Sequence, residues 1–183
     1  MKITATAIPD VLLIEPQRFG DARGLFSETY SRAAFAKAGL TMEFIQDNQS
    51  QSAKVGTVRG LHFQTPPFAQ TKLVRVMRGR ILDVAVDIRR SSPTFGRHVT
   101  AELSAKNWMQ LLVPVGFAHA FVTLEPDTEV LYKVSNIYAP QNDAGILWTD
   151  PDLGIAWPIL PAEATLSDKD VRLPRLKDVV SPF

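Results

Sequence analysis

The three histidines of the chain are its most direct candidates for acid–base chemistry. His62 lies in a strand-like run, three positions after Arg59. It is either a core histidine with satisfied hydrogen bonds or a general base, because imidazole titrates near working pH. His119 follows the turn at residues 114–116 and enters an apolar run, which suits the mouth of a barrel. His98 has the surroundings of an ordinary surface residue.

Three polar residues, Lys72, Asp83 and Tyr132, lie inside apolar, strand-like runs. On an outer face they would be solvated side chains, which is the default for charged strand residues. On the inner face of a small barrel they would line a polar pocket. The spacing alone leaves both arrangements open.

A metal site is the first competing interpretation, because histidine clusters in small barrels suit iron, manganese or zinc. The sequence contains no His-x-His or His-x3-His pair, and the absence of cysteine excludes thiolate ligands. A site formed by His62, His119 and a distant carboxylate remains as the alternative. We predict that the protein binds no metal.

Composition limits the class of protein. Lys and Arg number 20 against 19 Asp and Glu, so no global charge favours nucleic acid or an anionic membrane. No continuous apolar segment resembles a secretory signal or reaches the roughly 18 apolar residues of a membrane span. We therefore expect a cytoplasmic protein without nucleic-acid or membrane partners. Its 183 residues fit a single domain, with residues 162–183 as a C-terminal extension.

The candidate residues must be positioned mainly by β-strands. Apolar and polar residues alternate along residues 82–88 and 129–134, which is the period of a strand with one apolar face. Turn signals separate such runs, a spacing that indicates a sandwich or barrel. Only residues 31–39 have a helical pattern, with Ser31 as N-cap and Gly39 as the stop. We expect an all-β fold with short accessory helices.

Seven short motifs follow one another along most of the chain. They are FGDARGLFSE at residues 19–28, QDNQS at 46–50, VRGLHFQ at 58–64, TKLVR at 71–75, PVGFAH at 114–119, LYK at 131–133 and LSDKD at 166–170. In this order they resemble dTDP-4-dehydrorhamnose 3,5-epimerases, and the likeness runs from about Ile8 to Asp170. The ordered set is far more specific than any single motif.

The resemblance implies a fold, a reaction and partners. The fold would be a cupin-type jelly-roll β-barrel, assembled as a homodimer without metal or nucleotide cofactor. The reaction would epimerise C3 and C5 of dTDP-4-dehydro-6-deoxy-D-glucose to give dTDP-4-dehydro-L-rhamnose, in L-rhamnose precursor biosynthesis. The alternative is an enzyme that inverts one carbon or acts on another 4-keto-6-deoxy sugar nucleotide. A non-catalytic sugar-binding cupin and a metal-dependent dioxygenase or isomerase are more distant alternatives.

The resemblance also implies the catalytic residues. His62 would be the general base, paired with Asp170, and Tyr132 would deliver a proton to the opposite face of the sugar. Lys72 would sit at the ketone oxygen. These roles agree with the chemistry, because a hydrogen beside a ketone becomes acidic only when a base at carbon is matched by a cation or donor at oxygen.

The ligand contacts that the resemblance carries over are Arg23, Glu28, Gln46, Asp47, Asn48, Arg59, His119, Asp143 and Lys169. Arg23 and Arg59 are the natural pyrophosphate partners, because the guanidinium fork matches phosphate oxygens. Phe26 and Tyr138 are candidates to stack on the base, with a core role as the alternative. Two positions depart from the family pattern. Asp143 stands where glutamate is usual, and Ala120 stands where glycine is common.

One feature of this assignment conflicts with regular strand geometry. Successive side chains of a strand alternate between its faces, so Arg59 and His62 would point in opposite directions. Either a bulge near Gly60 brings them to one face, or Arg59 serves the site of a neighbouring subunit.

Overall fold

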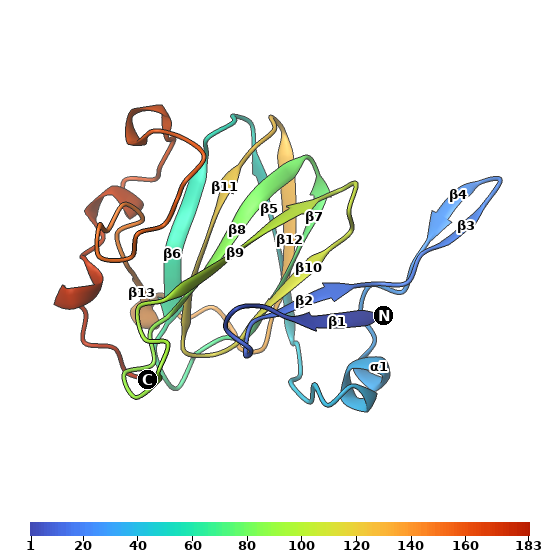
Figure 1. The fold of residues 1–183 in the computed structure, drawn as a ribbon, viewed down its shortest axis with the longest axis horizontal. Coiled ribbons are helices and arrows are strands. Elements are labelled where there is room, and N and C mark those ends of the chain that lie inside the picture. The colour runs from blue at the N-terminus through green and yellow to red at the C-terminus, as the bar shows by residue number, and fades with distance from the viewer.

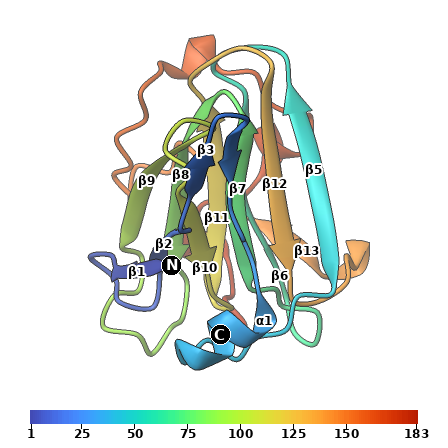
Figure 2. The same ribbon diagram turned by 90° about the vertical axis from the view of Figure 1, so that its right-hand side faces the viewer.

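The structure is a computed structural model that describes residues 1–183, and two antiparallel sheets facing each other make up its body (Figure 1). The first sheet has the order β1-β2-β10-β7-β12-β5. Its strands are β1 (Lys2–Ala5), β2 (Leu12–Glu15), β10 (Gln110–Val113), β7 (Lys72–Arg78), β12 (Thr128–Val134) and β5 (Gln46–Ser52). Figure 2 shows β7, β12 and β5 side by side along one wall.

The second sheet has the order β13-β6-β11-β8-β9. Its strands are β13 (Asp143–Gly145), β6 (Val58–Gln64), β11 (Phe117–Thr123), β8 (Arg80–Asp87) and β9 (His98–Ser104). Both predicted strand runs are present, as β8 and β12. The all-β prediction is confirmed.

The space between the sheets holds an apolar core at one end. Val74 and Val130 of the first sheet pack there against Ile81 and Phe121 of the second, and all four are buried. Burying an aliphatic or aromatic side chain of this size stabilises the fold by roughly 1.5–3 kcal/mol. The core therefore fixes how the two sheets lie against each other, and with them the side chains that project between them.

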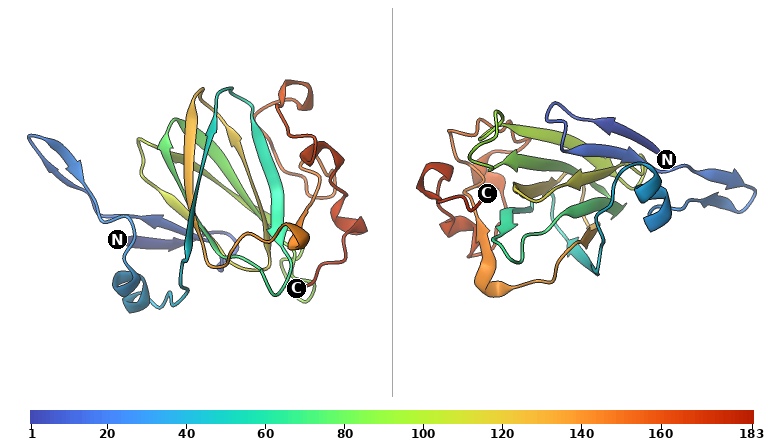
Figure 3. Two further views of the ribbon diagram at one scale, coloured as in Figure 1. Left: turned by 180° about the vertical axis from the view of Figure 1, so that it is seen from behind. Right: turned by 90° about the horizontal axis from the view of Figure 1, so that it is seen from below.

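The apolar face predicted for residues 82–88 is the outer face of β8. Val84, Val86 and Ile88 of this face are buried against Leu153 and Leu176. These two residues belong to the segment after β13, which lies over the outside of the second sheet (orange to red in Figure 3). The segment includes the short 3-10 helices η2 (Pro161–Glu163), η3 (Asp170–Arg172) and η4 (Leu176–Asp178); a further one, η1 (Pro140–Asn142), precedes β13. The predicted C-terminal extension thus forms part of the cover of this sheet.

The one α-helix, α1 (Arg32–Lys37), lies where the sequence predicts it. The Ser31 side chain caps its first turn by accepting a hydrogen bond from the Ala34 amide at 3.3 Å. Gly39 follows the helix with a φ of +83°, a conformation that favours glycine. Phe35 is the buried anchor of the helix. The helix is too short to span a membrane, and no other element of the structure is helical over a comparable length.

A two-stranded hairpin of β3 (Phe19–Asp21) and β4 (Gly24–Phe26) projects away from the barrel, as Figures 1 and 3 show. Its apolar side chains face solvent, with Phe19 53%, Leu25 58% and Phe26 71% exposed. Nothing within the chain covers these side chains.

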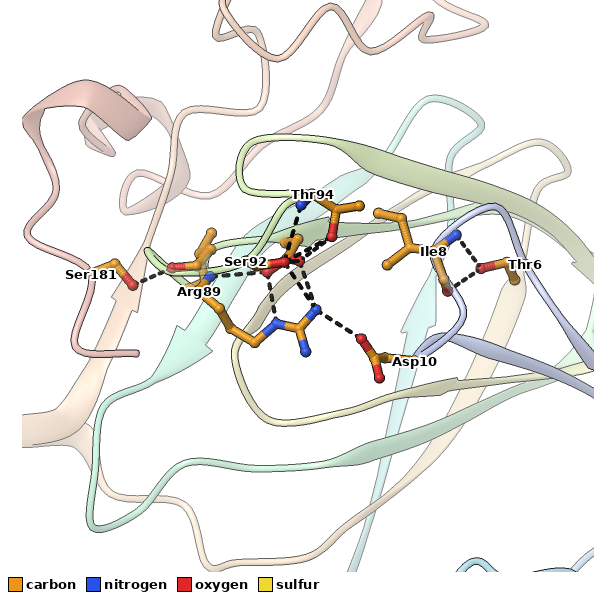
Figure 4. Close-up of polar contacts among 9 residues, drawn as sticks. Thr6, Ile8, Asp10, Arg89, Ser92, Thr94 and Ser181 are labelled. Carbon is orange, nitrogen blue, oxygen red and sulfur yellow. Dashed lines mark hydrogen bonds and ion pairs between the residues drawn. The ribbon is translucent and has the colours of Figure 1, made fainter.

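A polar network fastens the end of β8 to the N-terminal loop (Figure 4). The carboxylate of Asp87 is fully buried and accepts hydrogen bonds from the Arg89 guanidinium at 2.9 and 2.7 Å. The hydroxyls of Ser92 and Thr94 donate to the same carboxylate at 2.6 and 2.5 Å. Arg89 also donates to Asp10 at 2.9 Å. The buried charge is therefore fully compensated, as burial requires.

Candidate active site

The functional candidates converge on a cleft between the two sheets. Its inner part is a cavity of about 470 Å³, and its outer part is one of about 600 Å³. The two parts share Ser50, Arg59, His62, Lys72, Tyr132 and Lys169, so they form one continuous site. Volumes of this order suit a small-molecule ligand. Twelve of the predicted site residues line the cleft: His62, Lys72, Tyr132, Asp170, Gln46, Asp47, Asn48, Arg59, His119, Tyr138, Asp143 and Lys169.

His62 and Asp170 form a close pair in the inner cavity. The Nε2 atom of His62 lies 2.5 Å from Oδ1 of Asp170, although the two residues are 108 positions apart in the sequence. Burial alone would raise the pKa of the Asp170 carboxyl, but hydrogen bonds from His62, the Gly60 amide and Ser167 outweigh it and hold the pKa below its usual value. A carboxylate at this position fixes the tautomer of the imidazole and stabilises its cationic form.

A bulge at Gly60 brings Arg59 and His62 to the same side of β6. In the pairing of β6 with β11, His119 is opposite His62 and Phe121 is opposite Arg59, so β6 has one extra residue in this interval. Gly60 has a φ of +127°, and a Cβ there would lie 2.5 Å from the His119 carbonyl oxygen. Only glycine fits this backbone without displacement. Of the two explanations for the strand-face conflict, the bulge is therefore the one that the structure contains.

The opposite wall of the cavity supplies Lys72 and Tyr132. Burial lowers the pKa of Lys72 to about 8, against the opposing influence of Asp143 and Asp83. Burial raises the pKa of the Tyr132 phenol above its usual value, so its proton is retained at neutral pH. Lys72 and Tyr132 lie on β7 and β12, whereas His62 lies on β6 of the facing sheet. A ligand between the sheets would thus meet His62 and Tyr132 from two sides.

Asp83 and His119 make a second histidine–carboxylate pair, with Nε2 of His119 2.6 Å from Oδ1 of Asp83. Asp83 is fully buried on β8 and faces inward. The spacing left open whether Lys72, Asp83 and Tyr132 lie on the outer or the inner face of the barrel, and in the structure all three lie on the inner face. None of the three is an outward, solvated side chain.

The outer cavity is lined from β5 and from the segment around β13. Gln46 and Asn48 are both partly buried on the cavity side of β5, and the Gln46 side chain donates to that of Asn48 at 2.7 Å. Asp47 borders the cavity, but its carboxylate alternates to the other side of the strand and pairs with Lys133 at 2.8 Å.

The rim of the outer cavity is polar. The Tyr138 hydroxyl donates to Asp143 at 3.1 Å, and the Lys169 ammonium also pairs with Asp143. Lys169 comes from the C-terminal segment, so this pair ties that segment to the strand edge at β13. The Asp143 side chain is shorter than that of the glutamate usual at this position, but it still reaches a cationic partner.

Three predicted ligand contacts do not lie in the cleft of their own chain. Arg23 and Phe26 belong to the projecting hairpin, and Glu28 follows directly after it. Arg23 pairs with Asp21 of the same hairpin, and its side chain is 90% exposed. The structure thus separates these three residues from the other candidates within one chain.

Ser50 is a site residue that the prediction omitted. It lines both parts of the cleft, and its hydroxyl is buried without a hydrogen-bond partner. Strand alternation contained the signal, because Gln46, Asn48 and Ser50 occupy every second position of β5.

The chain brings together no group of three or more histidine, cysteine, aspartate or glutamate side chains that could hold a metal ion. In each of His62 and His119, the Nε2 atom is engaged by a single carboxylate. A carboxylate hydrogen-bonded to an imidazole holds the ring in one orientation and one tautomer.

Comparison with known proteins points to one family. The family model described as dTDP-4-dehydrorhamnose 3,5-epimerase matches residues 5–178. The dTDP-4-dehydrorhamnose 3,5-epimerase of Sinorhizobium fredii is 49% identical over 183 residues, which cover 100% of this chain and 93% of that relative.

Two solved structures share the fold over nearly their whole length. One is the dTDP-4-dehydrorhamnose 3,5-epimerase of Bacillus anthracis with TDP and PPi bound, at a TM-score of 0.92 and 51% identity, covering 95% of this chain and 98% of that one. The other is the dTDP-6-deoxy-D-glucose-3,5-epimerase of Legionella pneumophila in complex with dTDP-4-keto-L-rhamnose, at a TM-score of 0.93 and 40% identity, covering 97% and 94%.

These matches extend over both sheets, the hairpin and the C-terminal segment. They confirm the predicted cupin jelly-roll and the predicted class of enzyme, an isomerase of the epimerase type. The more distant alternative of a non-catalytic sugar-binding cupin is not supported by these matches. The chain belongs to the dTDP-4-dehydrorhamnose 3,5-epimerase family.

Proposed function

We propose that the cleft inverts C3 and C5 of dTDP-4-dehydro-6-deoxy-D-glucose, with His62 as base, Tyr132 as acid and Lys72 at the ketone oxygen. The observation that carries the proposal is the placement of the His62–Asp170 pair and Tyr132 on facing sheets of one cavity, with Lys72 beside them. Inversion needs a base on one face of the sugar and a proton donor on the other.

The first step breaks the C–H bond beside the ketone. The proton passes to His62, whose positive charge the Asp170 carboxylate stabilises at 2.5 Å. The bonding electrons delocalise onto the C4 oxygen, where the Lys72 ammonium offsets the developing negative charge. No change of oxidation state occurs, so the step needs no electron acceptor.

The second step returns a proton from the other side. Tyr132 donates its phenolic proton to the same carbon, and the configuration inverts. The raised pKa of Tyr132 keeps this proton available at neutral pH. His62 releases its proton to water and Tyr132 regains one, so each inversion leaves the enzyme unchanged. The second carbon beside the ketone reacts in the same way.

The outer cavity is the proposed site of the nucleotide. Arg59 and Lys169 line it and supply positive charge for a pyrophosphate, while Gln46, Asn48 and Tyr138 offer polar and aromatic surface to a base and sugar. The ligands TDP and dTDP-4-keto-L-rhamnose in the two related structures support this class of substrate. Asp47 and Asp143 remain predicted contacts in this outer cavity, and His119 remains one in the inner cavity.

A homodimer would give Arg23, Phe26 and Glu28 a role in binding. The hairpin projects from the barrel and exposes its apolar side chains, so we propose that it enters the cleft of a partner subunit. Co-refolding inactive His62→Ala and Arg23→Ala chains tests this arrangement. Random pairing leaves about one quarter of the sites intact if the hairpin acts across the dimer. No recovery of activity would contradict it.

The cytoplasm is the proposed compartment. A sugar nucleotide with a charged pyrophosphate does not cross a bilayer unaided, because burying charge in hydrocarbon is costly. The enzyme must therefore work where its substrate is made. Fractionation with activity in the membrane or extracellular fraction would contradict this location.

Deuterium exchange tests the catalytic roles. In deuterated water the enzyme should incorporate deuterium at both carbons beside the ketone without added metal or nicotinamide. His62→Ala should abolish incorporation and epimerisation, whereas Tyr132→Phe should still incorporate deuterium with inversion slowed by about 10²- to 10⁴-fold.

Two matched variants control for nonspecific damage. His98→Ala alters a histidine at the start of β9, and Tyr30→Phe alters a tyrosine packed on Phe35 and Phe44, so neither changes a cleft residue. Both should retain native exchange. Incorporation at one carbon only would favour the single-carbon alternative, and near-native exchange by His62→Ala would show that another residue is the base. Activity lost to a chelator and restored by iron or zinc would overturn the metal-free mechanism.

A further inference from the structure

The buried Asp83–His119 pair has no part in the proton transfers derived above. It lies on the inner side of β8 and β11, and His119 lines the same cavity as His62 and Lys72. His119 and His62 are direct partners in the pairing of β11 with β6. The histidines of the two histidine–carboxylate pairs therefore lie on neighbouring strands and line one cavity.

The Asp83 carboxylate is an unusual group to bury at this position. It is fully buried, one oxygen contacts only His119, and the other oxygen has no hydrogen-bond partner. Its neighbours on the inner side of β8, Ile81 and Ala85, belong to the apolar core. A buried carboxylate with an unsatisfied oxygen is costly, and an apolar side chain would stabilise the core better. Packing therefore gives no reason for an aspartate here.

We infer that Asp83 is a positioning residue: it holds the hydrogen of His119 on Nε2, so that Nδ1 is the ring nitrogen offered to the sugar beside Lys72. The inference rests on the proposed placement of the ketone at Lys72.

The tautomer follows from the chemistry of the contact. An ionised carboxylate only accepts hydrogen bonds, so the His119 nitrogen 2.6 Å from Asp83 carries a hydrogen. Nδ1 makes no hydrogen bond within the chain and is left for the ligand. It accepts a hydrogen bond from a sugar hydroxyl when the ring is neutral, and donates one to the C4 oxygen when the ring is charged.

The charges that face the pair support the same arrangement. The negative charges of Asp143 and Asp83 favour the charged form of Lys72, and the positive charge of Lys169 disfavours it. Asp83 therefore acts on both groups proposed to meet the oxygen side of the sugar. His62 and Asp170, which act on carbon, are held separately.

Imidazole nitrogen NMR tests the inference on the unmodified protein. The chain has only three histidines, so the ring signals can be assigned with His98→Ala and His119→Asn. In the free enzyme the His119 Nε2 signal should be that of a protonated nitrogen. A neutral His119 ring with its hydrogen on Nδ1 would overturn the inference without any change to Asp83.

Kinetics of Asp83→Asn provide the second readout. Asparagine keeps the shape but can present either its oxygen or its NH2 group to His119, so the tautomer is no longer fixed. We expect kcat to fall by about 10- to 100-fold, the usual effect of losing a group that orients a functional histidine, with dTDP affinity within about twofold of native. Deuterium incorporation should fall in parallel, because enolate formation is the affected step.

A double variant and a matched control complete the design. If Asp83 acts through His119, the Asp83→Asn/His119→Asn chain should be no slower than His119→Asn alone. Losses that multiply in the double variant would overturn the inference. An unchanged kcat in Asp83→Asn, or a change confined to its KM, would overturn it as well. Asp87→Asn is the control, since Asp87 is equally buried on the same strand but outside the cleft. It should lower stability while leaving kcat and the His119 signals unchanged. If His62→Ala still exchanged deuterium, the proposed role of His62 as the base would be wrong, and the inference about Asp83 and His119 would be unaffected.

Discussion

The depressed pKa of Lys72 makes a direct prediction about the alkaline side of the pH–rate profile. Burial moves this pKa from 10.5 to about 8. This difference corresponds to about 3 kcal/mol by which the cavity disfavours the charged form of Lys72. If the ammonium stabilises the enolate oxygen, kcat/KM should fall about tenfold per pH unit above pH 8 as the ammonium is lost.

The effect should differ between the free enzyme and its complex. The substrate brings a doubly charged pyrophosphate into the cleft, and nearby negative charge favours the ammonium. The alkaline limb of kcat should therefore lie at higher pH than the limb of kcat/KM. Tyr132 must also keep its proton, but its pKa lies above the usual value, so its ionisation comes later.

Lys72→Arg separates this group from other titrations. A guanidinium remains charged up to about pH 12, so the limb near pH 8 should disappear even though altered geometry lowers the plateau. The assay is the initial rate of epimerisation from pH 6 to 10, with an enzyme-free reaction at each pH to subtract exchange caused by hydroxide. A native profile that stays flat to pH 9.5, or an unchanged limb in Lys72→Arg, would refute the reasoning.

Three further predictions concern binding and stability. Arg59→Ala should raise KM by about 10- to 100-fold with little change in kcat, because a lost charged contact to pyrophosphate acts on ground and transition states alike; a native KM would remove Arg59 from the site. Asp87→Asn should cost about 2 kcal/mol of unfolding free energy at pH 7, because hydrogen bonds outweigh burial and lower the Asp87 pKa to about 2. This contribution is complete above the unfolded-state pKa and is lost as pH falls through the folded-state value, so urea unfolding of the two proteins should converge between about pH 4 and pH 2. Gly60→Ala should lower stability more than Gly24→Ala, since both have positive φ but only the Gly60 position is crowded; equal losses in thermal unfolding would contradict the steric argument.

The strands and the helix were predictable because their signals are local. Alternation along β8 and β12 identified both strands, and Ser31 with Gly39 marked the limits of α1. The same alternation would have separated Asp47 from Gln46 and Asn48, whereas the resemblance carried all three over as one motif. Strand alternation therefore predicts site residues best when the face of each residue is considered separately.

The direction of the apolar face of β8 was not readable. Alternation reveals that a strand has two unlike faces, but it does not say which face lies inside the barrel. Here the apolar side chains Val84 and Val86 point outward to the C-terminal segment, and the inner positions hold Asp83 and Ala85. The inward direction of Asp83 can therefore be predicted only when it is known that the C-terminal segment covers the outer face of β8.

The pairing of His62 with Asp170 shows why the site needs the complete chain. His62 is fixed by the ladder of β6, whereas Asp170 belongs to the segment that covers the outside of the same sheet. Within that segment, the buried Asp150 carboxylate accepts a hydrogen bond from the Leu176 amide at 2.7 Å. Leu176 packs in turn on the outward face of the sheet. The base and its carboxylate thus come from distant parts of the chain and meet at one cavity, and the apolar contacts of Leu176 help to hold the segment that carries Asp170.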